Sequence, residues 1–252
     1  AERVGLAAGG LSLPKTGSDG GGMVMARGLG HELVPTHPAL VPLLAADARW
    51  GALAGVSLPA RLAVWSGAKR VEERAGDFLF THKGFSGPVV LDVSHHFAGP
   101  DRAERRLTAA WGAPSVVDWD GRLRVGRGAV AGVLRGELPR RLAALLLERA
   151  GADGDTSCAQ LTRDARRRIV TELTECELAI AGDEGYRTAE VTDGGVALSD
   201  VEPGALESRR VPGLHFAGEI LDVTGRIGGY NFLWAWVTGR KAGEGVARLT
   251  RA

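Results

Sequence analysis

The stretch Gly213–Asp222, GLHFAGEILD, decides how this chain is expected to fold. An apolar strand, expected over Leu214–Ala217, runs directly into a Gly-Glu pair. A second glycine turn, Gly228–Asn231, then opens a long helix expected over residues 231–250. Clustered glycines mark places where the backbone turns sharply or approaches a ligand closely. The stretch therefore predicts a ligand cradled by main chain in an α/β fold.

The start of this helix suits a negatively charged or electron-rich ligand. The first N–H groups of a helix have no intrahelical acceptor and carry the positive end of its dipole. Gly228 and Gly229 would let a ligand approach these amides, and Glu219 and Asp222 could accept hydrogen bonds from the hydroxyls of a ribityl chain. A flavin fits these parts because its reduced form carries negative charge near N1 and the C2 carbonyl. The alternative is a glycine-rich helix start without a ligand.

The final helix is also expected to pack one face against a core. Its apolar residues recur at helical spacing; they are Phe232, Leu233, Trp236, Val237, Val246 and Leu249. Further helices are expected over Gly20–Gly30, Arg102–Trp111, Leu138–Ala150 and from Cys158 through the following arginines. Strands are expected over Val4–Ala8, Leu58–Val64, Asp77–Phe80, Pro88–Val93 and Glu172–Ala181.

Two other glycine-flanked segments are candidate sites. Gly9-Gly10 ends the first expected strand, where backbone could pass close to a dinucleotide. The segment Phe80–Pro88, FTHKGFSGP, holds His82 within a short loop. Because histidine titrates near neutral pH, His82 is a candidate proton donor. A structural β-turn is the alternative for this loop.

Composition excludes several classes of protein. The formal net charge of the 252 residues is +1, which argues against a dedicated nucleic-acid binder. The two cysteines, Cys158 and Cys176, match no zinc or redox spacing. His95-His96 resembles a metal-ligand pair, but no carboxylate or cysteine lies at matching spacing, so no metal site is expected. No apolar run approaches the ~18 residues needed to cross a bilayer, and no signal peptide is evident, so a cytoplasmic protein that does not bind membranes is expected.

The two ends of the chain share a glycine-rich α/β character that the middle lacks. Residues 1–36 and 186–252 are therefore expected to form the two parts of one ligand-binding domain. Residues 37–185 are interpreted as an insert, in which a part rich in strands is followed by a helical part. The insert is the expected substrate domain.

Taken together, three stretches resemble a family of bacterial flavoproteins that includes aminoacetone-oxidase-like and bile-acid-reductase-like enzymes. The matching segments are AAGGLSLPKTGSDG from Ala7, FTHKGFSGP from Phe80, and TDGGV from Thr192 together with PGLHFAGEILDVTGRIGGYN from Pro212. The resemblance implies an FAD-binding domain of the two-dinucleotide-binding type, interrupted by a β-barrel-like and helical insert. It also implies cofactor contacts from Gly9, Gly10, Gly218, Glu219, Asp222, Gly228, Gly229, Tyr230 and Asn231.

One departure from this family bears on the cofactor. The family opens with a strand-helix-strand unit carrying Gly-x-Gly-x-x-Gly, and this sequence has no such motif. We therefore expect a truncated chain with weakened FAD affinity. The leading hypothesis is an FAD-dependent oxidoreductase acting on a small organic substrate, with NAD(P)H as a candidate reductant. The alternatives are a non-catalytic remnant of such a flavoprotein and a nucleotide-binding module without redox activity.

Overall fold

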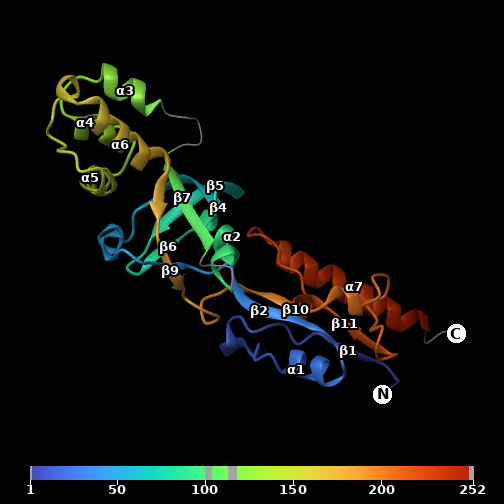
Figure 1. Ribbon diagram of the computed structural model, residues 1–252. Coiled ribbons are helices and arrows are strands. Elements are labelled where there is room, and N and C mark those ends of the chain that lie inside the picture. Colours follow the sequence, from blue (N-terminus) through green and yellow to red (C-terminus); the bar gives the residue numbers. More distant parts are fainter. Residues whose placement is uncertain (1, 100–103, 113–117, 250–252) are drawn as a thin grey trace. The chain divides into compact units, whose positions relative to one another are not determined.

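The computed structural model describes residues 2–99, 104–112 and 118–249, with side chains up to residue 247. The chain divides into two compact units. The first joins residues 1–42 to residues 183–252, and the second is the continuous segment Leu43–Gly182 (Figure 1). Helices and strands are mixed along the whole chain, so the predicted α/β class is confirmed.

The first unit is built on two pairs of strands from opposite ends of the chain. β1 (Val4–Leu6) lies parallel to β11 (Leu214–Phe216), and β2 (Leu33–Ala39) lies antiparallel to β10 (Val191–Val196). Two helices accompany them, α1 (Gly21–Gly28) and α7 (Tyr230–Leu249). Apolar side chains from both chain ends form one core; its buried members include Met23, Ala26, Val196, Leu214, Phe216, Ile220 and Leu221.

Asp200 joins two loops of this unit. Its Oδ2 accepts hydrogen bonds from the backbone N–H of Glu32 at 2.7 Å and from Nε of Arg210 at 2.8 Å. The Arg210 guanidinium, followed by the Glu32 N–H, holds the pKa of this carboxyl below its ordinary value, although partial burial opposes the shift. The carboxylate therefore stabilises the fold above its ordinary pKa, and this contribution is lost as pH falls through the lowered pKa.

We expect Asp200→Asn to lower the free energy of unfolding by about 0.5–1 kcal/mol at neutral pH, because the Arg210 partner is half exposed and solvent screens the pair. The difference from the parent chain should shrink as the pH falls through the lowered pKa of Asp200, because the parent carboxyl then also becomes neutral. Urea unfolding across this pH range measures both quantities. A difference in the free energy of unfolding that stays constant as the pH is lowered would contradict this account.

The second unit contains a seven-stranded sheet in the order β8-β7-β4-β5-β6-β3-β9. The strands are β3 (Leu43–Ala45), β4 (Ser57–Ser66), β5 (Lys69–Phe80), β6 (Gly84–Ser86), β7 (Arg105–Trp111), β8 (Cys176–Leu178) and β9 (Ile180–Asp183). Only Ala179 separates the two outermost strands, β8 and β9, along the chain. The two ends of the sheet are therefore held next to each other, which curls it into the barrel-like form expected of the insert.

Aromatic side chains fill the core of this sheet. Trp50 stacks on Phe80 with ring centroids 5.6 Å apart, and Phe78 meets Trp111 edge-on at 5.2 Å. Phe85 is fully buried among them. Such offset and edge-on pairs stabilise a core beyond the area that they bury.

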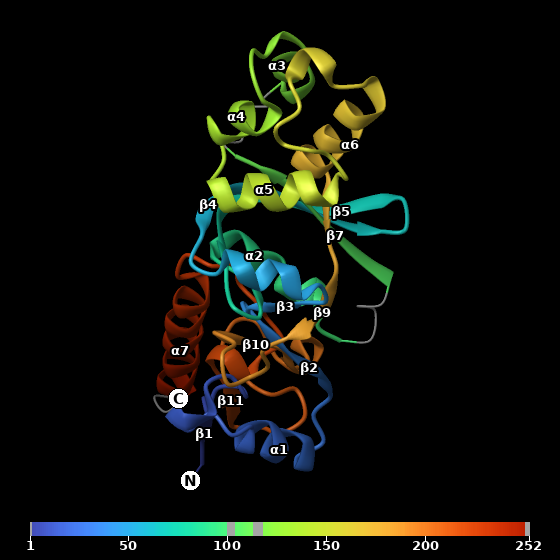
Figure 2. The ribbon, with the colours of Figure 1, turned by 90° about the vertical axis from the view of Figure 1, so that its left-hand side faces the viewer.

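Four helices of the second unit pack together (Figure 2). They are α3 (Trp119–Val125), α4 (Val130–Arg135), α5 (Arg140–Arg149) and α6 (Arg163–Thr174). The helices predicted around Leu138–Ala150 and through the arginines are thus confirmed as α5 and α6. Thr162 caps α6 by accepting the N–H of Ala165 at 3.2 Å, which satisfies one of its free amides.

Three secondary-structure predictions were wrong in this unit. The helix expected over Arg102–Trp111 is strand β7 in its described part, because pairing with β4 and β8 overrides local propensity. The strand expected over Pro88–Val93 is helix α2 (Pro88–Val93), which starts with proline at a position that needs no N–H. The strand expected over Glu172–Ala181 starts only at Cys176, after the end of α6.

The predicted buried stripe of α7 was also wrong. Phe232 and Trp236 are each 77% exposed, and Leu233 and Val237 are exposed as well. The helix instead packs against the core through Trp234, Thr238, Ala242 and Gly245. A Cβ on Gly245 would lie 2.6 Å from that of Ala205, so glycine is needed for the close approach of the helix at this position. Leu249 falls outside the described side chains. None of the described helices is long and apolar enough to span a membrane.

Candidate functional site

The turn after β11 is fixed to α7 by its first glycine. Gly218 has a φ of 78°, a left-handed conformation that glycine adopts without strain. Its N–H donates to Oγ1 of Thr238 at 2.9 Å, and its carbonyl accepts from Nε1 of Trp234 at 3.2 Å. Gly218 therefore connects the strand end to the helix and sets where the following Glu219 lies.

Glu219 braces three segments that are distant in sequence. Its Oε1 accepts the N–H of Thr192 at 2.6 Å, and its Oε2 accepts the N–H of Gly10 at 3.3 Å. Burial raises the pKa of this carboxyl, while the two backbone hydrogen bonds act in the opposite direction. Each oxygen keeps a second lone pair, so the predicted hydrogen bond to a ligand hydroxyl stays a prediction.

The Gly9-Gly10 segment lies against the same carboxylate. A Cβ on Gly10 would lie 2.4 Å from Oγ1 of Thr192 and 3.2 Å from Cδ of Glu219. The Thr192 hydroxyl accepts the N–H groups of Leu11 at 2.7 Å and Ser12 at 3.1 Å. Glycine is thus required at position 10 because the backbone there packs closely against the side chains of Thr192 and Glu219.

The loop before α7 is closed by Asn231. Its Oδ1 accepts the N–H of Gly225 at 2.7 Å, and its Nδ2 donates to the carbonyl of Gly225 at 2.9 Å. Gly228 and Gly229, with φ of 111° and 90°, make the turn between these residues. A Cβ on Gly229 would meet no atom within 4 Å. The backbone at Gly229 therefore has free space beside it.

A pocket of about 490 Å³ opens at this helix start. It is lined by Leu13, Leu40, Glu190, Val191, Glu219, Arg226, Ile227, Gly228, Gly229, Asn231, Phe232 and Ala235, all within the first unit. Its volume falls in the range usual for small-molecule sites, ~300–1,000 Å³. Apolar walls with a few polar groups suit a flat, largely apolar ring that carries polar edges.

Two residues that line the pocket and have an unusual backbone conformation were not predicted from the sequence. Leu13 has a φ of 50° and Leu40 a φ of 48°, in the left-handed region that leucine rarely adopts. Strained residues of this kind gather at ligand sites, where the surrounding structure holds them in place. No local sequence signal identifies them, because leucine has no preference for this conformation.

The structure brings together only part of the predicted set. Glu219, Gly228, Gly229 and Asn231 line the pocket, whereas Gly9 and Gly10 support Glu219 and Gly218 anchors the turn. Asp222 and Tyr230 are not among the lining residues, and Tyr230 is 53% exposed. Burial, and then the charge of Asp193, raise the pKa of Asp222.

His82 belongs to the second unit. It is exposed in the tight turn between β5 and β6, where the N–H of Thr81 donates to the carbonyl of Gly84 at 2.8 Å. This arrangement agrees with the structural-turn alternative, and a proton-donating role for His82 stays a prediction.

The pocket fits the ring end of a flavin. Its apolar walls suit the ring, and a Cβ on Gly229, at the start of α7, would meet no protein atom within 4 Å. Arg226, also in the wall, adds positive charge to the helix start. These groups would stabilise negative charge on a reduced ring. The Gly-x-Gly-x-x-Gly motif that would hold the ADP half is absent from the sequence.

Comparison with known proteins places the chain in a family. The model of the HI0933-like protein Rossmann domain matches residues 1–245. A ribosomal RNA dihydrouridine synthase of Escherichia coli is 36% identical over 93% of this chain and 58% of its own length. The protein of the same name from Haemophilus influenzae is 33% identical, over 96% and 60%.

A third relative is the 3-dehydro-bile acid delta(4,6)-reductase of Clostridium scindens, which is 34% identical over 98% of this chain and 62% of its own length. The chain thus spans about three-fifths of the length of these relatives. By the match over residues 1–245, the chain belongs to the HI0933-like protein Rossmann domain family.

Proposed function

We propose that this chain forms the flavin-ring site of an FAD-dependent oxidoreductase that passes hydride between the flavin and an organic substrate. The observation that carries the proposal is the pocket of about 490 Å³ at the glycine-opened start of α7. Family membership and a relative named as a reductase support the same class of enzyme. When bound, FAD would supply a ring that accepts and releases two electrons as hydride.

The residues of the pocket would hold and orient this ring. Gly228 and Gly229 line the pocket at the start of α7, whose first amides would donate toward a carbonyl edge of the ring. Leu13 and Leu40 would cover its apolar surface and exclude water, since both line the pocket. Glu219 keeps the Gly9-Gly10 segment in place and would accept a ribityl hydroxyl through its remaining lone pairs.

The names of the relatives narrow the reaction. Dihydrouridine is uridine with two hydrogens added across a carbon–carbon double bond, and a delta(4,6)-reductase acts on double bonds. We therefore extend the proposal to reduction of a conjugated double bond in a ring. Because such a reduction consumes two electrons, an external donor is required, and we propose NAD(P)H as the donor.

Titration of the 252-residue chain with flavins tests the ring site. We expect FAD to quench tryptophan fluorescence saturably and FMN to compete with it, because both carry the ring that the pocket fits. ADP should compete poorly, since the described contacts serve the ring end. Competition by ADP equal to that by FMN would instead support a nucleotide-binding module. Failure of every flavin to bind, in a chain with native circular dichroism, would support the non-catalytic remnant.

A second candidate substrate is a uridine within ribosomal RNA, favoured by two relatives of that name. An RNA substrate would contradict the expectation, based on net charge, that the chain does not act on nucleic acid. NAD(P)H oxidation by FAD-loaded protein, measured with a cyclic enone and with unmodified ribosomal RNA, separates the two. Mass spectrometry of nucleosides from the treated RNA would show dihydrouridine only if the RNA is a substrate.

A further inference from the structure

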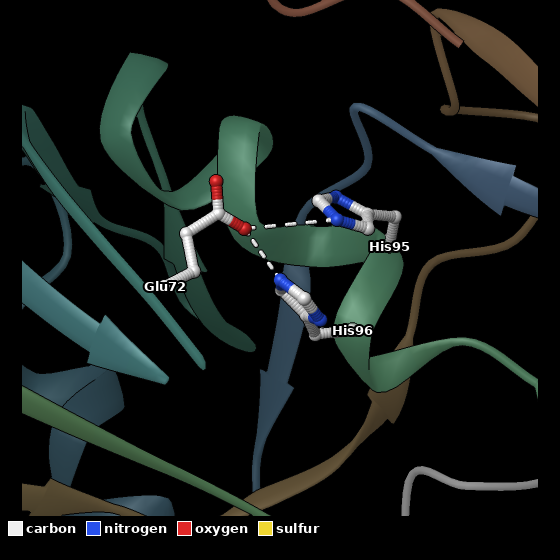
Figure 3. Close-up of side chains that lie close together, drawn as sticks. All are labelled: Glu72, His95 and His96. Atoms are coloured by element: carbon white, nitrogen blue, oxygen red, sulfur yellow. Dashed lines mark hydrogen bonds and ion pairs between the residues drawn. The ribbon is translucent and has the colours of Figure 1, made fainter. Parts of the chain in front are cut away.

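Glu72, His95 and His96 come together in the second unit, outside the pocket described above (Figure 3). Glu72 lies on β5, and the two histidines lie on a short 3₁₀ helix, Ser94–Phe97, that follows α2. Ligand atoms of all three residues lie within 4.8 Å of one another. The carboxylate missing beside His95-His96 in the sequence is therefore supplied by a strand far earlier in the chain.

The two imidazoles point toward the same carboxylate oxygen. Nε2 of His96 contacts Oε2 of Glu72, and Nε2 of His95 lies 3.7 Å from that atom, beyond a hydrogen bond. The two rings face each other with centroids 4.1 Å apart. A tetrahedral zinc with bonds of ~2.0–2.1 Å places neighbouring ligands roughly 3.4 Å apart, so small side-chain rotations suffice.

Arg74 binds the other oxygen of the Glu72 carboxylate. Its guanidinium pairs with Oε1 of Glu72, which leaves Oε2 for the two histidines. Outer partners of this kind orient ligating carboxylates in metal sites. Among the residues that the structure describes, Arg74 and Arg105 lie close to the group, and their repulsion should keep metal affinity below that of a closed four-ligand site.

The remaining properties suit a metal with an open position. Glu72, His96 and His95 are 12%, 19% and 37% exposed in their side chains, so water can reach the group.

We propose that Glu72, His95 and His96 bind one divalent transition metal of the zinc class, with water as the fourth ligand. Two imidazoles and one carboxylate are a ligand set that zinc uses where one position stays open to solvent. The site lies wholly within the second unit and is independent of the proposed flavin site.

Isothermal titration of the chelator-treated 252-residue chain with zinc tests the proposal. One zinc per chain is expected, and Glu72→Gln, His95→Ala and His96→Ala should each weaken binding at least ~10-fold. His82→Ala is the matched control, because it removes an exposed histidine of the same unit outside the cluster. Equal binding by all four variants, or no binding by the parent chain, would overturn the proposal.

Cobalt substitution provides a readout that needs no variant. Co²⁺ bound by these residues and water should give the intense visible bands of a four-coordinate site. Only the weak spectrum of six-coordinate cobalt would contradict the assignment. Zinc should also raise the melting temperature of the parent chain and of His82→Ala, but not that of correctly folded His96→Ala.

Discussion

Replacing Gly229 with alanine is expected to lower flavin affinity at least ~10-fold, which corresponds to a loss of about 1.4 kcal/mol of binding free energy. Gly229 lines the pocket and opens α7, and a Cβ there would meet no protein atom within 4 Å. The added methyl group would therefore occupy space proposed for the ring and separate it from the helix amides. Quenching of tryptophan fluorescence by FAD and FMN measures the change.

The left-handed φ of 90° at Gly229 means that alanine also strains the backbone, by about 1–2 kcal/mol. Gly30→Ala provides the matched control. Gly30 has a φ of 87°, no atom within 4 Å of its added Cβ, and no part in the pocket. Both variants should lose similar stability, but only Gly229→Ala should lose flavin affinity. Equal flavin affinities in the two variants would show that the ring does not contact this turn.

Gly10→Ala is expected to destabilise the first unit by about 2–4 kcal/mol, because it combines overpacking with lost hydrogen bonds. The new Cβ would lie 2.4 Å from Oγ1 and 2.6 Å from Cβ of Thr192. Thr192 is only 1% exposed, so its side chain cannot move aside freely. Any displacement would break the hydrogen bonds from Leu11 and Ser12 to its hydroxyl.

Gly5→Ala controls for the general effect of alanine in this segment. Gly5 lies in the neighbouring strand β1, and a Cβ there would meet nothing within 4 Å. Its effect on the free energy of unfolding should stay within about 0.5 kcal/mol, as for other exposed substitutions. Urea unfolding of both variants gives the comparison. Similar stabilities would show that Thr192 does not restrict position 10.

Features fixed by neighbouring residues were predictable from the sequence. The strand before Gly218, the glycine turns and the start of α7 follow from glycine placement and apolar patterning. α5 follows from the helical spacing of its leucines. The glycine segments that carry the candidate site were therefore identified before any spatial information.

Features that depend on distant partners were not predictable. β7 is a strand because β4 and β8 pair with it, although its own sequence suggests a helix. The apolar residues of α7 show helical period, but period alone does not reveal that the helix packs through Thr238 and Ala242. Glu72 reaches His95-His96 only through the fold, so linear spacing could not predict that cluster.

The pairing of β1 with β11 has a consequence for synthesis on the ribosome. Val4 lies opposite Leu214, so β1 is synthesised about two hundred residues before its partner strand β11. The continuous segment Leu43–Gly182 can complete its own core during that interval. A nascent chain stalled just before β11 should therefore contain a protease-resistant barrel unit and a β1 segment that remains open to cleavage.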